Sequence, residues 1–223
     1  KIKFNLSFKE ASLTGFQWVD FLFYNSIHLD SAYIADVVLE TITPDLEEIT
    51  DKMGQDEGSQ GENYRLIELN HFRVNKADFI NKDSKSDSTR LLINDLFVFA
   101  DGFSLSVEDI KSQEAIFSVD IIEGYLGEVQ LHVNDYINVI QANDLSFNTA
   151  EQRLSIDKGA FKNKLRKYSY INRFDKETNW MEVNNARLEI TGMNFQSYFR
   201  EGKIDADNVQ LDHLELEVFR DKR

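Results

Sequence analysis

The octapeptide IQANDLSF, residues 140–147, has apolar side chains at its first, third, sixth and eighth positions and the polar pair Asn143–Asp144 between them. The same pattern recurs in full three times, as IELNHFRV (67–74), MEVNNARL (181–188) and IDADNVQL (204–211). Shorter versions of it begin at residues 34 (IADVVLE) and 93 (INDLFVF). The four copies start at residues 67, 140, 181 and 204, which is too irregular for a closely stacked solenoid.

This pattern fits a strand with one irregular point. Apolar positions between Ile204 and Val218, placed at about 100° per residue, scatter around the whole helical circle, so a helix is excluded. On a strand the first two apolar positions share one parity and the last two the other, so the polar pair must absorb one residue as a bulge. Asn and Asp tolerate the backbone angles that such a bend needs.

Bulged strands of this kind predict a mainly β fold, a long twisted antiparallel sheet curved into a trough with one to three short helices. Seventeen Phe, eight Tyr and a single Pro agree, because aromatic residues are enriched in strands. A closed β-sandwich and a β-solenoid remain as alternatives, and a period of five residues does persist from Ile204 to Leu216.

Charge and cysteine usage exclude several classes of function. The 39 acidic and 25 basic residues give a net charge of -14, which repels phosphate backbones, so nucleic acid is not expected as a partner. The absence of cysteine excludes disulfides, thiolate metal sites and cysteine nucleophiles, and leaves the cellular compartment open.

We expect residues 1–223 to form one mainly β domain that is a fragment of a larger protein. The first forty residues predict three or four strands, and residues 43–52 and 106–115 predict short helices with capping signals. The polar stretches at 52–63 and 81–89 predict mobile loops. Residues 161–180 predict a long basic surface connection or a helical excursion, with a patch for lipid head groups or a partner as the alternative.

Catalytic and metal-binding signatures are absent from the sequence. It contains no G-x-S-x-G, P-loop or G-x-G-x-x-G motif, and its four histidines are far apart in sequence. The acid pairs Asp205/Asp207 and Glu215/Glu217 are typical of a solvated strand face. The alternatives are a calcium site at Asp205, Asp207 and Asn208 and a glycosidase carboxylate pair. We therefore predict a protein that is not an enzyme, with no catalytic residue, no metal and no cofactor. Trp18 and Trp180 are candidates for core residues or for sugar-stacking platforms.

Three segments carry a resemblance to a known family: SFNTAEQRLSIDKGAF (146–161), NWMEVNNARLEITGMNFQSYFREGKIDADNVQL (179–211) and QLDHLELEVFRDKR (210–223). They resemble large AsmA-like envelope proteins of the Bacteroidetes type, in the style of the repeat rather than in a catalytic signature. The resemblance implies the repeating β-groove architecture of TamB-like and bridge-like lipid-transfer proteins. It also implies an inner-membrane anchor outside this chain, a periplasm-facing or cell-envelope location, and a part in phospholipid transport or outer-membrane homeostasis.

An acyl chain needs a continuous dry lining, and the repeat supplies one in the form of alternating apolar residues. The predicted lining consists of Ile67, Leu69, Phe72, Val74, Ile140, Leu145, Phe147, Val183, Leu188, Val209, Leu211 and Leu216. The expected partners are phospholipid acyl chains and other envelope proteins. The same residues would equally build a closed core, and the chain would then be a surface-exposed binding or scaffold module for glycan or for another envelope protein.

Overall fold

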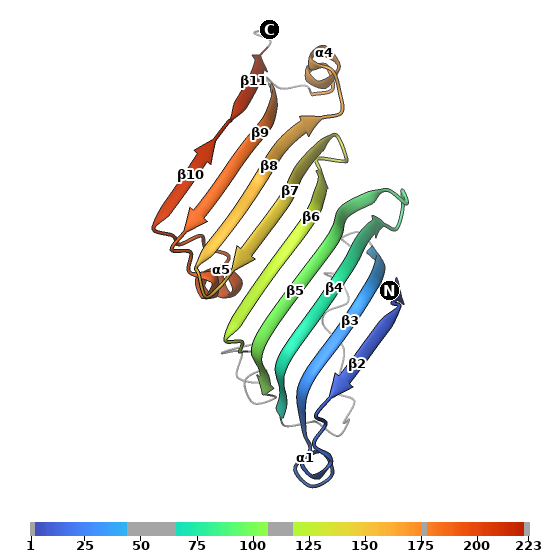
Figure 1. The fold of residues 1–223 in the computed structure, drawn as a ribbon. Helices are drawn as coiled ribbons and strands as arrows, with labels where there is room; N and C mark the ends of the chain where they lie inside the picture. The colour runs from blue at the N-terminus through green and yellow to red at the C-terminus, as the bar shows by residue number, and fades with distance from the viewer. Residues whose placement is uncertain (1–2, 44–65, 107–117, 175–177, 221–223) are drawn as a thin grey trace.

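Eleven strands form one open sheet, accompanied by three short helices, in the part of the chain that the computed structural model describes, residues 3–43, 66–106, 118–174 and 178–220 (Figure 1). The strands are β1 (Lys3–Ser7), β2 (Glu10–Thr14), β3 (Ser26–Thr43), β4 (Leu66–Asp83), β5 (Thr89–Ser106), β6 (Ile121–Val133), β7 (Asn138–Asn148), β8 (Arg153–Asn163), β9 (Asn179–Thr191), β10 (Asn208–Asp212) and β11 (Glu215–Arg220). The helices are α1 (Trp18–Tyr24), α4 (Lys167–Ile171) and α5 (Phe195–Glu201). The mainly β fold with few short helices is confirmed, and because the sheet is not closed, the described residues form neither the sandwich nor the solenoid.

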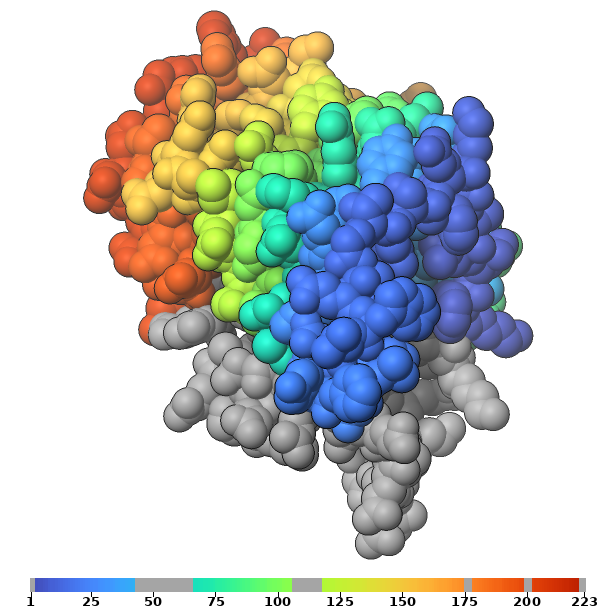
Figure 2. Space-filling model, turned by 60° about the horizontal axis from the view of Figure 1, so that its bottom comes forward, coloured from blue at the N-terminus to red at the C-terminus, as the bar shows by residue number. Residues whose placement is uncertain are grey.

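The sheet is mixed rather than wholly antiparallel as predicted. Strands β4 to β9 form an antiparallel meander, but β3 lies parallel to β4. A parallel neighbour needs a long connection along the chain, and in the sequence β3 ends at Thr43 and β4 begins only at Leu66. Figures 1 and 2 place the N-terminal and C-terminal strands at opposite ends of the sheet.

A row of left-handed residues crosses the sheet where the polar pairs predicted a bend. Positive φ angles occur inside five strands, at Asp36 (φ 49°), Lys76 (φ 64°), Asp95 (φ 53°), Asp144 (φ 53°) and Asn185 (φ 55°). The pairing register between β5, β6 and β7 is the same on both sides of this row. The irregular points therefore lie beside one another and bend the strands at a common level.

A left-handed residue lies in the predicted polar pair of the copies 140–147 and 181–188, and also in the shorter versions that begin at residues 34 and 93. The copies 67–74 and 204–211 differ. In 67–74 the left-handed residue is Lys76, just beyond the copy. In 204–211 the residues before Asn208 precede β10, and the backbone N–H of Asp207 donates to the carbonyl of Thr191 at 3.1 Å. Here the left-handed residue is His213, between β10 and β11.

Both outer edges of the sheet are interrupted at the level of this row. Strands β1 and β2 pair with successive halves of β3, and β11 and β10 pair with successive halves of β9. Lys9, between the first two strands, donates its backbone N–H to the carbonyl of Ala35 at 3.1 Å. Each pair of short strands therefore behaves as one edge strand with a break at the bend.

Several local predictions differ from the structure. The alternation of Phe21 and Phe23 predicted a strand, but these residues lie in α1, which follows the left-handed Gly15. In 81–89, β4 continues to Asp83 and β5 begins at Thr89, so only a short turn remains. That turn is ordered by Asp83, whose carboxylate accepts the backbone N–H groups of Lys85 and Ser86 at 2.8 and 3.0 Å.

The predicted basic connection at 161–180 is shorter than expected, because β8 extends to Asn163, β9 begins at Asn179, and α4 lies between them. The predicted helix at 43–52 and the predicted loop at 52–63 lie outside the described residues, except for Thr43 at the end of β3. Most of the predicted helix at 106–115 lies outside them as well, since β5 ends at Ser106.

Candidate functional site

One face of the sheet carries apolar rungs, because directly paired residues on neighbouring strands point to the same side. The first rung consists of Ile34, Val74, Val98, Gly124, Phe147, Leu154, Ile190 and Val209. The second consists of Val37, Ala77, Leu96, Leu126, Leu145, Ile156, Leu188 and Leu211. Phe147 and Leu145 stand two residues apart on β7, so both rungs belong to one face, here called the apolar face.

A third rung continues this face beyond the bend and consists of Leu91, Leu131, Ile140, Phe161, Val183 and Leu216. A single left-handed residue shifts the alternation of side chains by one position. Asp144 does so between Ala142 and Leu145, and Asn185 does so between Val183 and Leu188. The apolar residues on both sides of the bend therefore point the same way, which is why the sequence shows the one-residue change of parity.

All twelve predicted lining residues fall on this apolar face. Nine of them belong to the three rungs, and Phe72 precedes Val74 of the first rung by two residues on β4. Leu69 pairs with Phe103 and Ile67 pairs with Leu105. The left-handed Gly102 of β5 lies between these pairs and the first rung and shifts the alternation of side chains by one more position, so that Leu69 and Ile67 also point to the apolar face. The register thus places on one face residues that are up to 149 positions apart in sequence, from Ile67 to Leu216.

Coverage of the apolar face is uneven. Near one end, Phe195 of α5 packs with Ile190 and Met193 in a cluster whose members are at most 8% exposed. The ring of Phe147 reaches this cluster, with its centroid 6.3 Å from that of Phe195. On the next strand, Val209 is paired directly with Ile190 and yet is 58% exposed. The apolar face therefore remains open where it reaches the edge of the sheet.

Both edges carry exposed apolar residues on this face. At one edge Leu211, Leu216 and Val218 are 51, 55 and 54% exposed. At the other edge Phe4 and Leu13 pair with Thr41 and Ala32 of β3 and are 73 and 67% exposed. An apolar face that stays exposed up to its borders differs from a closed core, in which such residues are covered.

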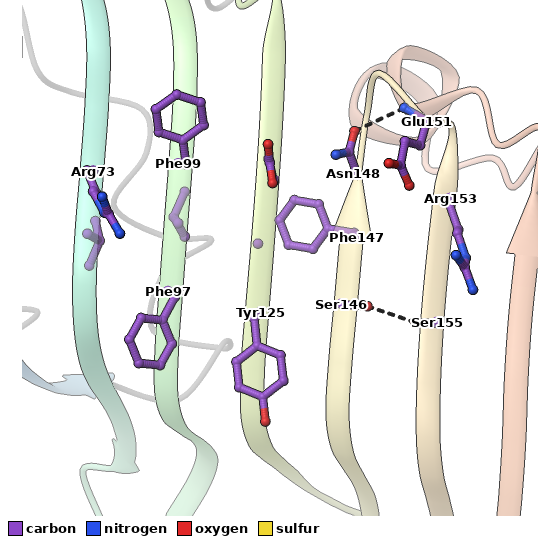
Figure 3. Close-up of a pocket in the computed structure, with 14 residues that line it drawn as sticks. Arg73, Phe97, Phe99, Tyr125, Ser146, Phe147, Asn148, Glu151, Arg153 and Ser155 are labelled. Atoms are coloured by element: carbon purple, nitrogen blue, oxygen red, sulfur yellow. Dashed lines mark hydrogen bonds between the residues drawn. The ribbon is translucent and has the colours of Figure 1, made fainter.

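The opposite face contains a depression of about 670 Å³ that crosses β4 to β8 (Figure 3). Phe97 and Phe99 of β5 and Tyr125 of β6 supply aromatic side chains, and the rings of Phe97 and Tyr125 have centroids 6.1 Å apart. Both are more than a third exposed. Arg73 of β4 is paired directly with Phe99, so its guanidinium group lies at one side of the aromatic surface.

Polar side chains complete this depression. The hydroxyl of Tyr125 donates to a carboxylate oxygen of Asp144 at 2.6 Å, and this hydrogen bond raises the pKa of the tyrosine above its ordinary value. The hydroxyls of Ser146 and Ser155 are 2.7 Å apart, and Arg153 forms an ion pair of 2.8 Å with Glu189. These groups offer both donors and acceptors beside the aromatic rings.

The sequence analysis did not predict this depression, because it considered only the apolar positions of the repeat and not the residues between them. A signal was nevertheless present: Phe97 and Phe99 alternate with Val98, and Arg73 stands between Phe72 and Val74. In a strand these residues must lie on the face opposite to the rungs.

The connection carrying α4 packs at the opposite end of the sheet from α5. Tyr170, Ile171 and Trp180 form a buried cluster with Ile137, and the indole N–H of Trp180 donates to the carbonyl of Leu165 at 3.0 Å. Trp180 is 4% exposed and is a core residue, whereas Trp18 in α1 is 66% exposed.

Other charged side chains form small local groups. His28 lies 2.9 Å from a carboxylate oxygen of Asp20 and 3.3 Å from one of Glu68, and Lys167 is paired with Glu217. Within the described ranges, no three or more His, Asp or Glu side chains are grouped so that they could hold a metal ion.

No protein-family model matches this chain, and no curated protein matches it by sequence. Among the helices that the structure describes, none is long and apolar enough to cross a membrane.

Proposed function

We propose that this chain binds lipid acyl chains on its apolar face, as the periplasm-facing part of an AsmA-like envelope protein. The observation that carries the proposal is the alignment of apolar rungs across the sheet, together with the exposure of that face at its edges. An acyl chain gains free energy from burial in proportion to the apolar area removed from water, about 25 cal/mol per Å². A rung that runs across strands about 4.8 Å apart offers such a chain an unbroken lining.

The cell-envelope setting and the link to phospholipid transport come from the resemblance of the repeat. In this proposal the parent protein is anchored in the membrane by parts outside this chain, and the sheet needs no catalytic group, metal or cofactor. Its contribution is a surface along which acyl chains are held away from water, in transport or in the assembly of the transport machinery.

Two measurements on the gently purified protein test this function. Native mass spectrometry followed by lipid extraction should find bound phospholipid, and a fluorescent acyl probe should gain intensity on binding. The variant Leu211→Ser should weaken probe binding about tenfold, because it places a hydroxyl in the open part of the second rung. Gln210→Ser is the matched control, since Gln210 neighbours Leu211 but faces the other side of the sheet. Absence of both lipid and probe uptake would exclude the function.

A second candidate is favoured by the aromatic depression, namely binding of a saccharide. Phe97 and Tyr125 present ring faces on which the C–H groups of a sugar ring can stack, and Arg73, Ser146 and Ser155 are hydrogen-bonding groups at its sides. A glycan array with the purified chain tests it. Phe97→Ala should abolish any signal that Leu211→Ser leaves intact, and an array without signal would exclude this candidate.

A further inference from the structure

The two outer edges of the sheet match one another. One edge is the interrupted strand β1–β2, which pairs from Lys3 opposite Ile42 to Thr14 opposite Ser31. The other edge is the interrupted strand β10–β11, from Asn208 to Arg220. Neither edge has a further strand on its outer side among the described residues. Along residues 3–14 and along residues 208–219, the outward backbone groups of the strands are thus available for pairing.

The directions of the two edge strands are opposite. Strands β1 and β2 run antiparallel to β3, which runs parallel to β4, and the direction then alternates along the meander to β9 and to β10–β11. Two copies placed side by side in the same orientation therefore bring β10–β11 of one copy next to β1–β2 of the other as an antiparallel pair. Their apolar faces then lie on the same side.

The apolar rungs also meet at matching levels. Phe4 and Leu216 belong to one level of the sheet, connected through the paired residues Thr41, Asn81, Leu91, Leu131, Ile140, Phe161 and Val183. Ala11 and Val209 belong to another, at the two ends of the first rung. The register that places Phe4 opposite Leu216 also places Ala11 opposite Val209, and it brings the breaks of the two edges, residues 8–9 and 213–214, within two residues of each other along the strands.

Charge supports the same register. Lys3 precedes Phe4 and Glu217 follows Leu216, so an antiparallel pairing of Phe4 with Leu216 places the ammonium group opposite this carboxylate, which is also paired with Lys167 of its own chain. Asp212 and Glu215 make the β10–β11 edge more acidic still. Opposite charges across a strand pair are favourable, whereas two copies of the acidic edge would repel each other.

We propose that a second copy of this chain pairs its β1–β2 edge with the β10–β11 edge of the first, in a head-to-tail contact that extends the sheet. The contact is heterologous, so it leaves a free edge at each end and allows further copies to add. It continues the apolar rungs from one copy into the next. The proposal does not depend on what the apolar face binds.

The absence of cysteine makes a direct test possible. Phe4→Cys and Leu216→Cys are prepared as single variants, mixed and oxidised, and a disulfide-linked dimer of the two variants is expected. The double variant should give a ladder in steps of one chain mass, 25.9 kDa. The control pair is Phe4→Cys with Val209→Cys, because Val209 lies seven residues, about 23 Å of strand, away from Leu216 and should give severalfold less product.

Three results would overturn the proposal. One is equal cross-linking in the matched pair and in the control pair. Another is a Phe4→Cys dimer that forms as readily as the mixed dimer, since that would indicate a symmetric contact between identical edges. The third is light scattering of the unmodified chain that reports one chain mass at every concentration up to the solubility limit.

Discussion

Ile190 and Val209 are paired directly on neighbouring strands and point to the same face, but Ile190 is 5% exposed and Val209 is 58% exposed. The difference lies in what covers them: α5 places Phe195 over Ile190, and nothing comparable covers Val209 among the described residues. The same kind of residue on the same rung thus serves stability at one position and remains available for binding at the other.

The largest effect on stability is expected at Ile190, the covered residue of this pair. Ile190→Ala should lower the free energy of unfolding by about 2–5 kcal/mol, because it leaves a cavity beneath α5. Val209→Ala should change it by no more than about 0.5 kcal/mol, since an exposed side chain loses few contacts. Urea denaturation of both variants gives the two values. Equal losses would mean that the edge of the sheet is as tightly packed as the region under α5.

The next effect concerns the turn that leads from β9 to α5. Gly192 has φ +68°, and a Cβ at this position would lie 2.2 Å from a carboxylate oxygen of Asp207. Gly192→Ala should therefore cost about 1–3 kcal/mol of stability. Gly202, at the end of α5, has φ +66° but no heavy atom within 4 Å of such a Cβ, so Gly202→Ala is the matched control for backbone strain alone. Thermal unfolding that ranks Gly202→Ala as the more damaging change would contradict this account of the turn.

How far the sequence predicts this molecule depends on the range of the interaction concerned. The bends at Asp144 and Asn185 were predictable because a left-handed residue is a local preference of Asn and Asp, and the apolar lining followed from parity. The parallel pairing of β3 with β4 was not, since no local pattern in either strand distinguishes it from antiparallel pairing. The uneven cover provided by α5, and the aromatic depression of Arg73, Phe97 and Tyr125, required knowledge of which strands are neighbours.

A smaller effect on stability is expected at the bend, which crosses both the covered and the open parts of the apolar face. Asn185→Ala should cost about 1 kcal/mol, because alanine lacks the side chain that makes the left-handed conformation tolerable, while Asn185→Gly should be close to neutral. Asn184→Ala is the neighbouring control without a positive φ angle. Chemical denaturation of the three variants provides the test, and a Gly variant less stable than the Ala variant would contradict the need for a left-handed residue at position 185.

The smallest expected effect concerns the pH dependence of stability at His132, near the end of the sheet opposite to α5. There the Nδ1 atom of His132 is buried and has no hydrogen-bond partner among the described residues, and the ring lies 6.1 Å from that of Tyr136. Burial, and then the charge of Lys164, hold the pKa of His132 below its ordinary value of 6.5. Well above pH 6.5 the ring is neutral in both the folded and the unfolded states, so there it adds no pH dependence to stability.

As the pH falls below 6.5 the unfolded chain takes up a proton on His132 before the folded chain does, so stability should decline until the pH passes below the lowered pKa of the folded state. His132→Gln should reduce this decline while leaving the other titrating groups in place. Denaturation midpoints of both proteins at about pH 8 and pH 5 measure the difference. An identical pH dependence in the two proteins would mean that His132 is protonated as easily in the folded sheet as in water, and that this end of the sheet, unlike the region under α5, does not exclude solvent.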